Sequence, residues 1–284
     1  MAFRLGIVGA ENTGKSFSRS FIPDGENVLI IAPSNKATWL TNSQNITVGP
    51  LDIQTPKVQG WEQAQKLLKL PSQSHVVKYI MNEPTYVPGV TLKRANLPGN
   101  IIVLKHLTHL PLWLDFADKY MPWIHTIILP DFTHFISEII SQKTFIEKKH
   151  GSEAYQTFWE LAADALQSFI LKADTLRRDL IIVTEYHSEY IDTLGSYSIF
   201  SSGGKMLNEK FKPASYYDVM LYTTTSFNDE GIVDQFQFVT KPTRVFPQAR
   251  CLDLFKEAYI PNNLQEVLTR LRAHQNLPIV PYKE

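Results

Sequence analysis

The sequence has only one cysteine, Cys251, among its 284 residues. A single cysteine excludes an internal disulfide and is typical of proteins of a reducing cytoplasm, where we expect it to pack in the core. Long apolar runs are missing too. None approaches the roughly 20 residues that cross a bilayer, and residues 5–10 are too short for the apolar part of a signal peptide. These absences predict a soluble, cytoplasmic protein that makes no contact with a membrane.

A net charge of either sign is also absent. Lys plus Arg number 28, and Asp plus Glu number 28, so no overall basic field attracts nucleic acid and any such binding needs a local patch. His106 and His109 are close in the sequence, but no partner pair with zinc-like spacing accompanies them. A zinc site is therefore not expected.

The chain has no repeat, low-complexity segment or clean linker, and 44% of its residues are apolar. This composition can bury a large core. We therefore expect one domain over residues 1–284, with a core over residues 1–215. A β-rich extension and a C-terminal helix are expected over residues 216–284.

Apolar runs and helical patterns alternate along the first two thirds of the chain. Short apolar runs typical of buried parallel strands cover residues 3–8, 27–32, 100–106, 125–130 and 179–186. Helical patterns lie between them at residues 60–70, 110–123 and 153–178. This alternation predicts an α/β fold with a parallel sheet. Further on, period-two alternation around the turn NDEG predicts an antiparallel hairpin, and residues 261–274 predict a final helix.

One segment carries a specific chemical signal, GAENTGKS at residues 9–16. Its spacing, G-x-x-x-x-G-K-S, is that of a phosphate-binding loop (P-loop), in which backbone N–H groups wrap phosphates. In such a loop Lys15 reaches the β- and γ-phosphate oxygens, and the Ser16 hydroxyl binds Mg²⁺. An apolar strand precedes the segment and a helical pattern follows it, as the motif requires. The predicted nucleotide-binding residues are Gly9, Ala10, Glu11, Asn12, Thr13, Gly14, Lys15, Ser16 and Phe17.

Two later strands end in polar residues that suit the same site. The run HTIILPD ends in Asp131, which matches a Walker B strand whose carboxylate helps to hold Mg²⁺. The run DLIIVTEYH ends in Thr184, Glu185 and His187. Here His187 is a candidate sensor of the γ-phosphate, and Glu185 is a candidate for orienting the attacking water. Exposed polar residues at a strand exit are the alternative for both.

In this order, the elements resemble the RecA-like P-loop ATPases encoded by bacteriophages, a family linked to single-strand annealing and recombination. The resemblance extends over nearly the whole chain, and the P-loop is its one specific motif. It rests on the segments GAENTGKS, IILPDFTH, AYQTFWELAADAL, IIVTEYHSE, KPASYYDVMLY, TKPTRVF and IPNNLQEVL. It implies a RecA-like sheet flanked by helices, ATP and Mg²⁺ as cofactors, a ring or filament of identical subunits, and single-stranded DNA as partner.

The chain departs from this family at two points. RecA-like enzymes commonly have a catalytic Glu at the end of the strand after the P-loop helix, but here that strand ends in Pro33, Ser34 and Asn35. The residue that activates water is therefore unassigned. Pro130 precedes the Walker B Asp131 and lacks an N–H group, so it must fall at the end of the strand or at an unpaired position.

The resemblance also directs attention to two sets of cations. Lys241 and Arg244, on a hairpin of the expected β-rich extension, are candidates for a charge that this hairpin carries across a subunit boundary to a neighbour's γ-phosphate, with solvated hairpin charges as the alternative. Single-strand binding needs cations and aromatic faces. The segment after the run DLIIVTEYH contains both: Tyr197, Phe200, Lys205, Lys210 and Lys212. Residues 142–151, with Lys143, Lys148 and Lys149, are a second candidate for this contact, and a surface loop that packs its own aromatics is the alternative for each.

Two other functions stay open at the level of sequence. A P-loop phosphotransferase would act on a nucleotide or small metabolite, although the chain has no compact arginine cluster of the kind that forms a mobile lid. A nucleotide switch that does not hydrolyse ATP is consistent with the missing strand-end Glu. Phosphate release, its response to single-stranded DNA and the search for a phosphorylated acceptor separate the three functions.

Overall fold

The structure is a computed structural model that forms two compact units. Unit 1 consists of Met1–Asp24, Asp131–Thr133 and Leu180–Glu284, and unit 2 of Gly25–Pro130 and His134–Asp179. The residues that the structure describes are 2–15, 28–33, 50–52, 101–103, 110–120, 124–135, 137, 152–184, 187–191, 195–200 and 213–275.

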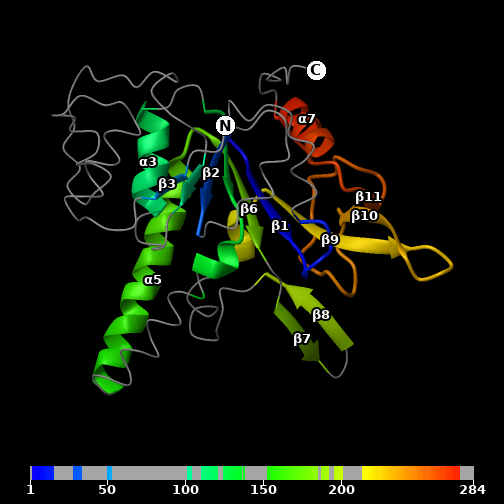
Figure 1. Ribbon diagram of the computed structural model, residues 1–284, viewed down its shortest axis with the longest axis horizontal. Helices are drawn as coiled ribbons and strands as arrows, with labels where there is room; N and C mark the ends of the chain where they lie inside the picture. Colours follow the sequence, from blue (N-terminus) through cyan, green and yellow to red (C-terminus); the bar gives the residue numbers. More distant parts are fainter. Residues whose placement is uncertain are drawn as a thin grey trace. The chain divides into compact units, whose positions relative to one another are not determined.

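Unit 1 is built on a mixed sheet whose strand order is β11-β10-β9-β1-β6 (Figure 1). Strand β1 lies between two parallel neighbours, with Leu5 opposite Ile181 on β6 and opposite Val219 on β9. Strands β9, β10 and β11 then pair in antiparallel fashion. The bounds are β1 (Arg4–Val8), β6 (Asp179–Thr184), β9 (Val219–Phe227), β10 (Val233–Val239) and β11 (Tyr259–Pro261).

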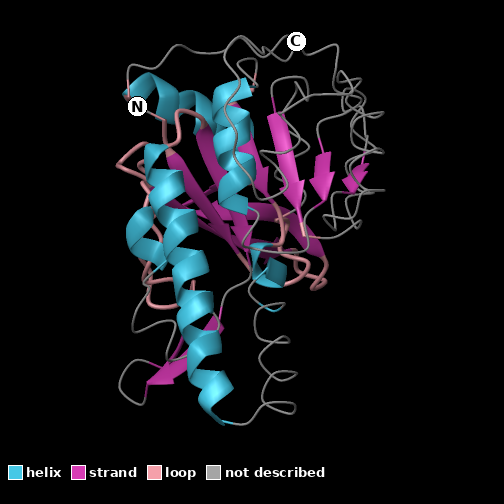
Figure 2. Ribbon diagram, turned by 90° about the vertical axis from the view of Figure 1, so that its left-hand side faces the viewer, coloured by secondary structure: helices cyan, strands magenta, loops and turns pink. Residues whose placement is uncertain are grey.

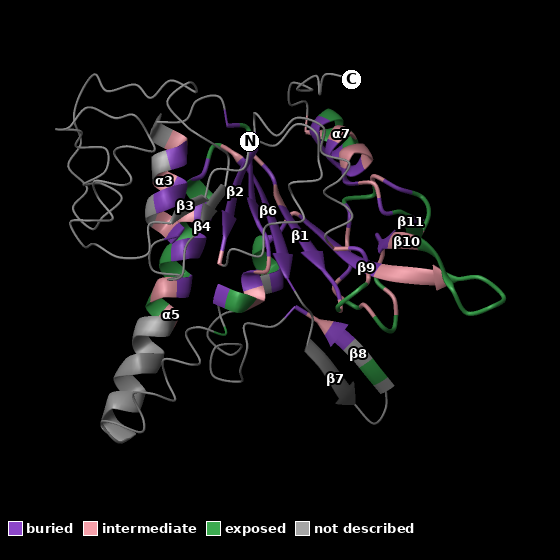
Figure 3. Cartoon of the chain, viewed as in Figure 1, coloured by how far each residue is buried: buried purple, intermediate pink, exposed green. Residues whose placement is uncertain are grey.

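Burial follows the apolar pattern of these strands. The residues Leu5–Val8 of β1 and all of β6 are buried. The hairpin of β9 and β10 is buried at its base and exposed at its outer end (Figure 3). The core therefore sits around β1, the strand that leads into the predicted P-loop.

The C-terminal helix α7 (Leu264–His274) also belongs to unit 1. Its buried side chains Leu264, Val267, Leu268 and Leu271 recur at the spacing of one helix face. Asn263 caps the first turn, because its side-chain oxygen accepts a hydrogen bond from the N–H of Glu266 at 3.2 Å. The predicted helix over residues 261–274 is confirmed, and it begins three residues after Pro261.

Unit 2 has a parallel sheet of order β5-β2-β4-β3. Two helices, α3 and α5, lie side by side in it (Figures 1 and 2), joined by an ion pair of Lys172 with Asp115. The bounds are β2 (Val28–Ala32), β3 (Pro50–Asp52), β4 (Ile101–Val103), β5 (Thr126–Leu129), α3 (Leu110–Tyr120) and α5 (Ser152–Thr175).

Two small elements complete the described structure: an antiparallel hairpin of β7 (His187–Ile191) and β8 (Gly195–Ile199), and the 3₁₀ turn η6 (Pro213–Tyr216). The backbone N–H of Ser198 donates to the carbonyl of Val245 at 2.7 Å. Gln248 holds Phe200, the residue after β8, because its Oε1 accepts from the N–H of Phe200 at 2.9 Å and from the hydroxyl of Tyr222 at 2.9 Å. Burial raises the pKa of Tyr222, so its hydroxyl stays protonated and able to donate.

The predicted α/β class is confirmed, since parallel strands and helices make up both units. All five predicted apolar strands are present, as are the helices predicted at 110–123 and 153–178 and the hairpin around NDEG. The helix predicted over 60–70 lies outside the described residues. The expected boundary between the core and the β-rich extension does not separate two sheets. β9, the first strand of the expected extension, pairs in parallel with β1 inside the core sheet.

The single cysteine has the expected place in the core. Cys251 is 4% exposed, and burial raises the pKa of its thiol to about 12. The thiol is therefore protonated at neutral pH, and the thiolate that reacts with oxidants and metals is not formed. None of the helices in the described part of the chain is long and apolar enough to cross a bilayer.

Candidate nucleotide-binding site

The P-loop leaves β1 at Val8 and turns tightly through residues 9–15. The N–H of Gly9 donates to the carbonyl of Thr184 at the end of β6, at 3.2 Å. Asn12 and Gly14 have φ angles of 60° and 91°. Glycine adopts this left-handed region freely, and asparagine is one of the few other residues that tolerate it. Ser16 and Phe17 lie outside the described residues.

Close packing against β9 explains the glycine at position 9. A Cβ atom there would lie 1.8 Å from Oγ1 of Thr223 and 2.6 Å from Oγ1 of Thr13. These two hydroxyls are themselves hydrogen-bonded at 2.6 Å, and the Thr13 hydroxyl donates to the carbonyl of Ala10 at 2.8 Å. The start of the loop is thus fixed to the sheet by side chains from β9.

The other loop glycine, Gly14, is buried against β10 and β11. A Cβ atom at this position would approach the ring of Phe236 to 2.7 Å and Nδ2 of Asn262 to 2.9 Å. The Asn262 side chain donates to the carbonyl of Gly14 at 3.1 Å. The far end of the loop is therefore held by residues that are more than 200 positions away in the sequence.

The side chain of Lys15 folds back over the loop. Its Nζ donates to the carbonyls of Gly9 at 2.7 Å and Ala10 at 3.0 Å. Meanwhile the backbone N–H groups of Asn12 and Gly14 donate no hydrogen bond to any residue that the structure describes. A loop that combines a lysine ammonium with backbone donors fits the phosphates of a nucleotide.

The Walker B candidate follows β5 directly. β5 ends at Leu129 and Pro130 comes after it, which confirms that the proline falls outside the strand. Asp131 is partly exposed and has a φ of 52°. Its segment is tied to the loop through Thr184: the hydroxyls of Thr133 and Thr184 lie 2.9 Å apart, and the Thr184 carbonyl accepts from the N–H of Gly9.

This arrangement fits a magnesium ion of the P-loop type, which keeps several waters and takes few protein ligands. Asp131 lies in the same unit as the P-loop, whereas its expected partner Ser16 lies outside the described residues. Among the described residues there is no group of three or more His, Cys, Asp and Glu side chains that could cage a metal by themselves.

The structure changes the interpretation of the predicted DNA-binding segment. His187 and Tyr197 belong to the hairpin of β7 and β8, which the sequence did not predict. Phe200 is only 2% exposed, and its ring packs 5.6 Å from that of Tyr217. A buried ring cannot stack on a base, so the prediction for Phe200 is corrected to a core role. The other candidates lie outside the described residues: Glu185, Lys205, Lys210, Lys212 and residues 142–151.

Lys241 and Arg244 are not on the hairpin where the sequence placed them. The strand β10 ends at Val239, so both residues lie in the following segment, which returns to β11. Nζ of Lys241 donates to the carbonyl of Lys256 at 2.6 Å, whereas Arg244 is exposed. The correction removes the argument that a hairpin carries them across a subunit boundary, and it leaves Arg244 as the more accessible cation.

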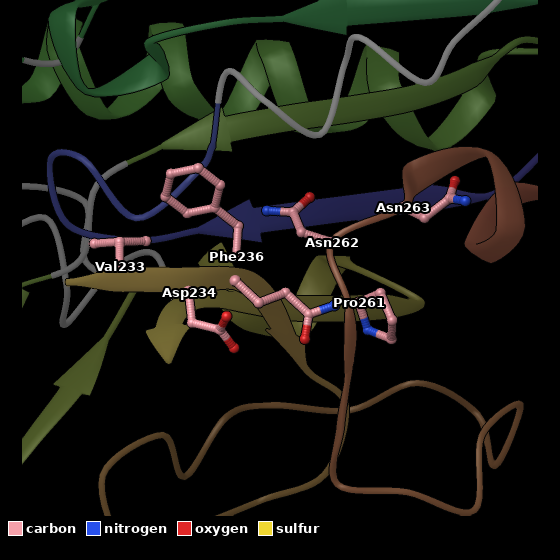
Figure 4. Close-up of a pocket in the computed structure, with 7 residues that line it drawn as sticks. Val233, Asp234, Phe236, Pro261, Asn262 and Asn263 are labelled. Atoms are coloured by element: carbon pink, nitrogen blue, oxygen red, sulfur yellow. The ribbon is translucent and has the colours of Figure 1, made fainter. Parts of the chain in front are cut away.

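A groove of about 420 Å³ adjoins the P-loop side of β10. Phe236 and Asn262, which contact Gly14, form part of its wall. In Figure 4 both side chains lie toward the N-terminal segment, drawn in blue, and Asp234 points the other way. The remaining lining residues are Val233, Gln235, Pro261 and Asn263.

Three residues of this site were missed by sequence reasoning: Thr223, Phe236 and Asn262. Thr223 is one of three consecutive threonines in β9, Phe236 has the pattern of an ordinary strand residue, and Asn262 adjoins the N-cap of α7. Each has a local explanation in the sequence, and no motif spacing connects any of them to residues 9–15.

Comparison with protein-family models gives no match for this chain, and no curated protein matches it. The resemblance to RecA-like ATPases therefore stays a prediction from the sequence.

Proposed function

We propose that this protein binds ATP with Mg²⁺ at the P-loop and hydrolyses it, as a RecA-like ATPase. The observation that carries the proposal is the conformation of residues 9–15. Gly14 turns the backbone with a φ of 91°, Gly9 allows the close approach of β9, and Nζ of Lys15 lies 2.7 Å from the carbonyl of Gly9. Proteins use this combination of backbone donors and one flexible ammonium to bind phosphates.

The roles of the residues follow from their chemistry. Lys15 exchanges its carbonyl partners for the β- and γ-phosphate oxygens and neutralises the charge that develops as water attacks the γ-phosphate in line. Ser16 and Asp131 would hold Mg²⁺, which would supply further neutralisation of that charge. Glu185 and His187 are the candidates for orienting the water and sensing the γ-phosphate, and the residue that activates the water is unassigned.

The groove beside Gly14 offers space for the nucleoside. Phe236 and Asn262, two of its lining residues, also pack against Gly14. The lining of the groove includes the aromatic ring of Phe236 and the amide groups of Gln235 and Asn263, which suit contacts with a base and a sugar. A ligand with phosphates in the P-loop can therefore extend toward β10.

We propose single-stranded DNA and identical subunits as the partners, in the cytoplasm, which is that of the host if a phage encodes the chain. The support for DNA is the resemblance and the content of residues 187–217, where Tyr197, Lys205, Lys210 and Lys212 are the remaining candidates. The β9–β10 hairpin is a poor DNA contact, because residues 219–240 contain three acidic residues and no Lys or Arg. In an assembly, Arg244 or Lys241 would act on a neighbour's γ-phosphate.

The proposal predicts steady release of phosphate from Mg–ATP, with a rate that rises when single-stranded DNA is added. The measurement is phosphate release with and without a homopolymeric oligonucleotide, with radiolabelled ATP used to detect any phosphorylated acceptor. Stoichiometric ATP binding without release would favour the nucleotide switch. Transfer of label to an acceptor would favour the phosphotransferase. Unchanged release with DNA would remove DNA from the proposal.

A second prediction concerns the metal. The Asp131→Asn variant keeps the size of the side chain but loses its charge, so half-maximal activity should need several-fold more Mg²⁺. Asp218→Asn serves as the control, because that carboxylate accepts from the N–H of Arg4 at 2.8 Å at the start of β1. Superimposable Mg²⁺ titrations of Asp131→Asn and the parent protein would remove Asp131 from the site.

A further inference from the structure

Asn262 is a buried amide that connects distant parts of unit 1. It is 2% exposed. Its backbone N–H donates to the carbonyl of Phe236 at 3.0 Å, and its Nδ2 donates to the carbonyl of Gly14 at 3.1 Å. One residue therefore links the end of β11, the middle of β10 and the P-loop.

The Asn262 side chain is costly where it lies. Its Oδ1 atom is enclosed and has no hydrogen-bond partner among the residues that the structure describes. An acceptor buried without a partner opposes folding, and an apolar side chain of similar size would avoid this penalty. The stability of the fold therefore does not explain why an amide is present at this position. The donor group of this amide points at Gly14, the loop residue with a φ of 91°.

The bond to Gly14 has a geometric consequence for the loop. A trans peptide is planar, and its C=O and N–H groups point in opposite directions. When Asn262 holds the carbonyl of Gly14, it fixes the plane of the Gly14–Lys15 peptide. The N–H of Lys15 then points away from Asn262, on the opposite side of that peptide. Without this bond, the glycine can rotate freely among several conformations.

We propose that Asn262 is a positioning residue that fixes the P-loop in its phosphate-binding conformation before the nucleotide arrives. The inference rests on the proposed function of the loop. Asn262 touches no phosphate itself. It acts through Gly14, and it reduces the ordering that the nucleotide would otherwise have to impose on binding.

The test is the Asn262→Ala variant. Its KM for ATP should rise about tenfold, the factor that corresponds to roughly 1.4 kcal/mol. Its kcat should stay within about threefold of the parent, because the bound loop regains the same geometry and only uniform binding is lost. A purely structural role gives the opposite split: a lower melting temperature and a lower active fraction, with KM unchanged.

Tripolyphosphate, which has no nucleoside, separates the loop from the groove. If Asn262 acts on the loop, Asn262→Ala weakens the binding of tripolyphosphate and ATP by the same factor. If ATP alone is weakened, Asn262 acts through the groove wall and the proposal is wrong. The Asn262→Asp variant, of equal size but without the donor, should bind both ligands at least as weakly as Asn262→Ala.

Thr240→Val is the matched control. Thr240 is also 2% exposed, and its hydroxyl donates to the backbone carbonyl of Glu257 at 2.6 Å. Its substitution removes a buried bond of the same kind without touching the loop, so it should lower the melting temperature and leave KM unchanged. If the parent binds ATP and Asn262→Ala has the parent's KM, the positioning role is refuted. If the parent itself binds neither ATP nor tripolyphosphate, the proposed function fails instead.

Discussion

The Lys15→Ala variant should lose ATP hydrolysis by a factor of at least about 10², while its fold survives. Removing a single group that stabilises charge in a transition state typically costs about 10²–10³ in rate. In the structure the Lys15 ammonium donates hydrogen bonds to the carbonyls of Gly9 and Ala10, which both belong to the loop. Its removal therefore disturbs the phosphate site and leaves the packing of β1 intact. Phosphate release and thermal unfolding measure the two effects.

Two further variants sharpen this result. Lys15→Met keeps the length of the side chain without its charge, so it should be as inactive as Lys15→Ala. Lys256→Ala removes an exposed lysine of the same unit and should retain full activity. Turnover in Lys15→Ala equal to that of Lys256→Ala would contradict the P-loop interpretation, whatever the unfolding temperatures.

The apolar runs and the P-loop could be predicted from the sequence because their information is local. Val28–Ala32 and Asp179–Thr184 are buried throughout, as their continuous apolar character indicated. The GKS motif likewise needs only neighbouring residues to be found. Pro130 was restricted to the end of a strand by its missing N–H, and it follows β5.

The surroundings of the loop could not be predicted, because tertiary structure alone brings them together. Asn262 lies 248 positions from Gly14 and reaches it through the pairing of β11 with β10. Phe200 shows the converse error. The aromatic and lysine content of the segment around Phe200 suited stacking on DNA bases. However, the hydrogen bond from the Phe200 N–H to Gln248 and the contact of its ring with Tyr217 place Phe200 in the interior. Local composition does not distinguish an exposed aromatic from a buried one.

The Gly9→Ala variant should be destabilised and should lose nucleotide binding. The added methyl group would lie 1.8 Å from Oγ1 of Thr223. Strand β9 cannot readily move aside, because Tyr222 is held in register with Val8 in the parallel pair. Overpacking of this kind typically costs about 1–3 kcal/mol of folding free energy, and urea unfolding measures it. The same clash displaces Thr13, whose hydroxyl is bonded to Thr223 at 2.6 Å, and with it the start of the P-loop.

A second substitution identifies the cause of that loss. Thr223→Ala removes Oγ1, so the double variant Gly9→Ala with Thr223→Ala should recover part of the stability and of the ATP affinity. Recovery should be incomplete, because Oγ1 of Thr13 also lies 2.6 Å from the new methyl group. Thr223→Val places a methyl group where Oγ1 was and should give no rescue. The two double variants should therefore differ by at least about 1 kcal/mol, as expected for residues in direct contact. Equal unfolding free energies for them would show that the close approach of β9 is not the reason for the glycine at position 9.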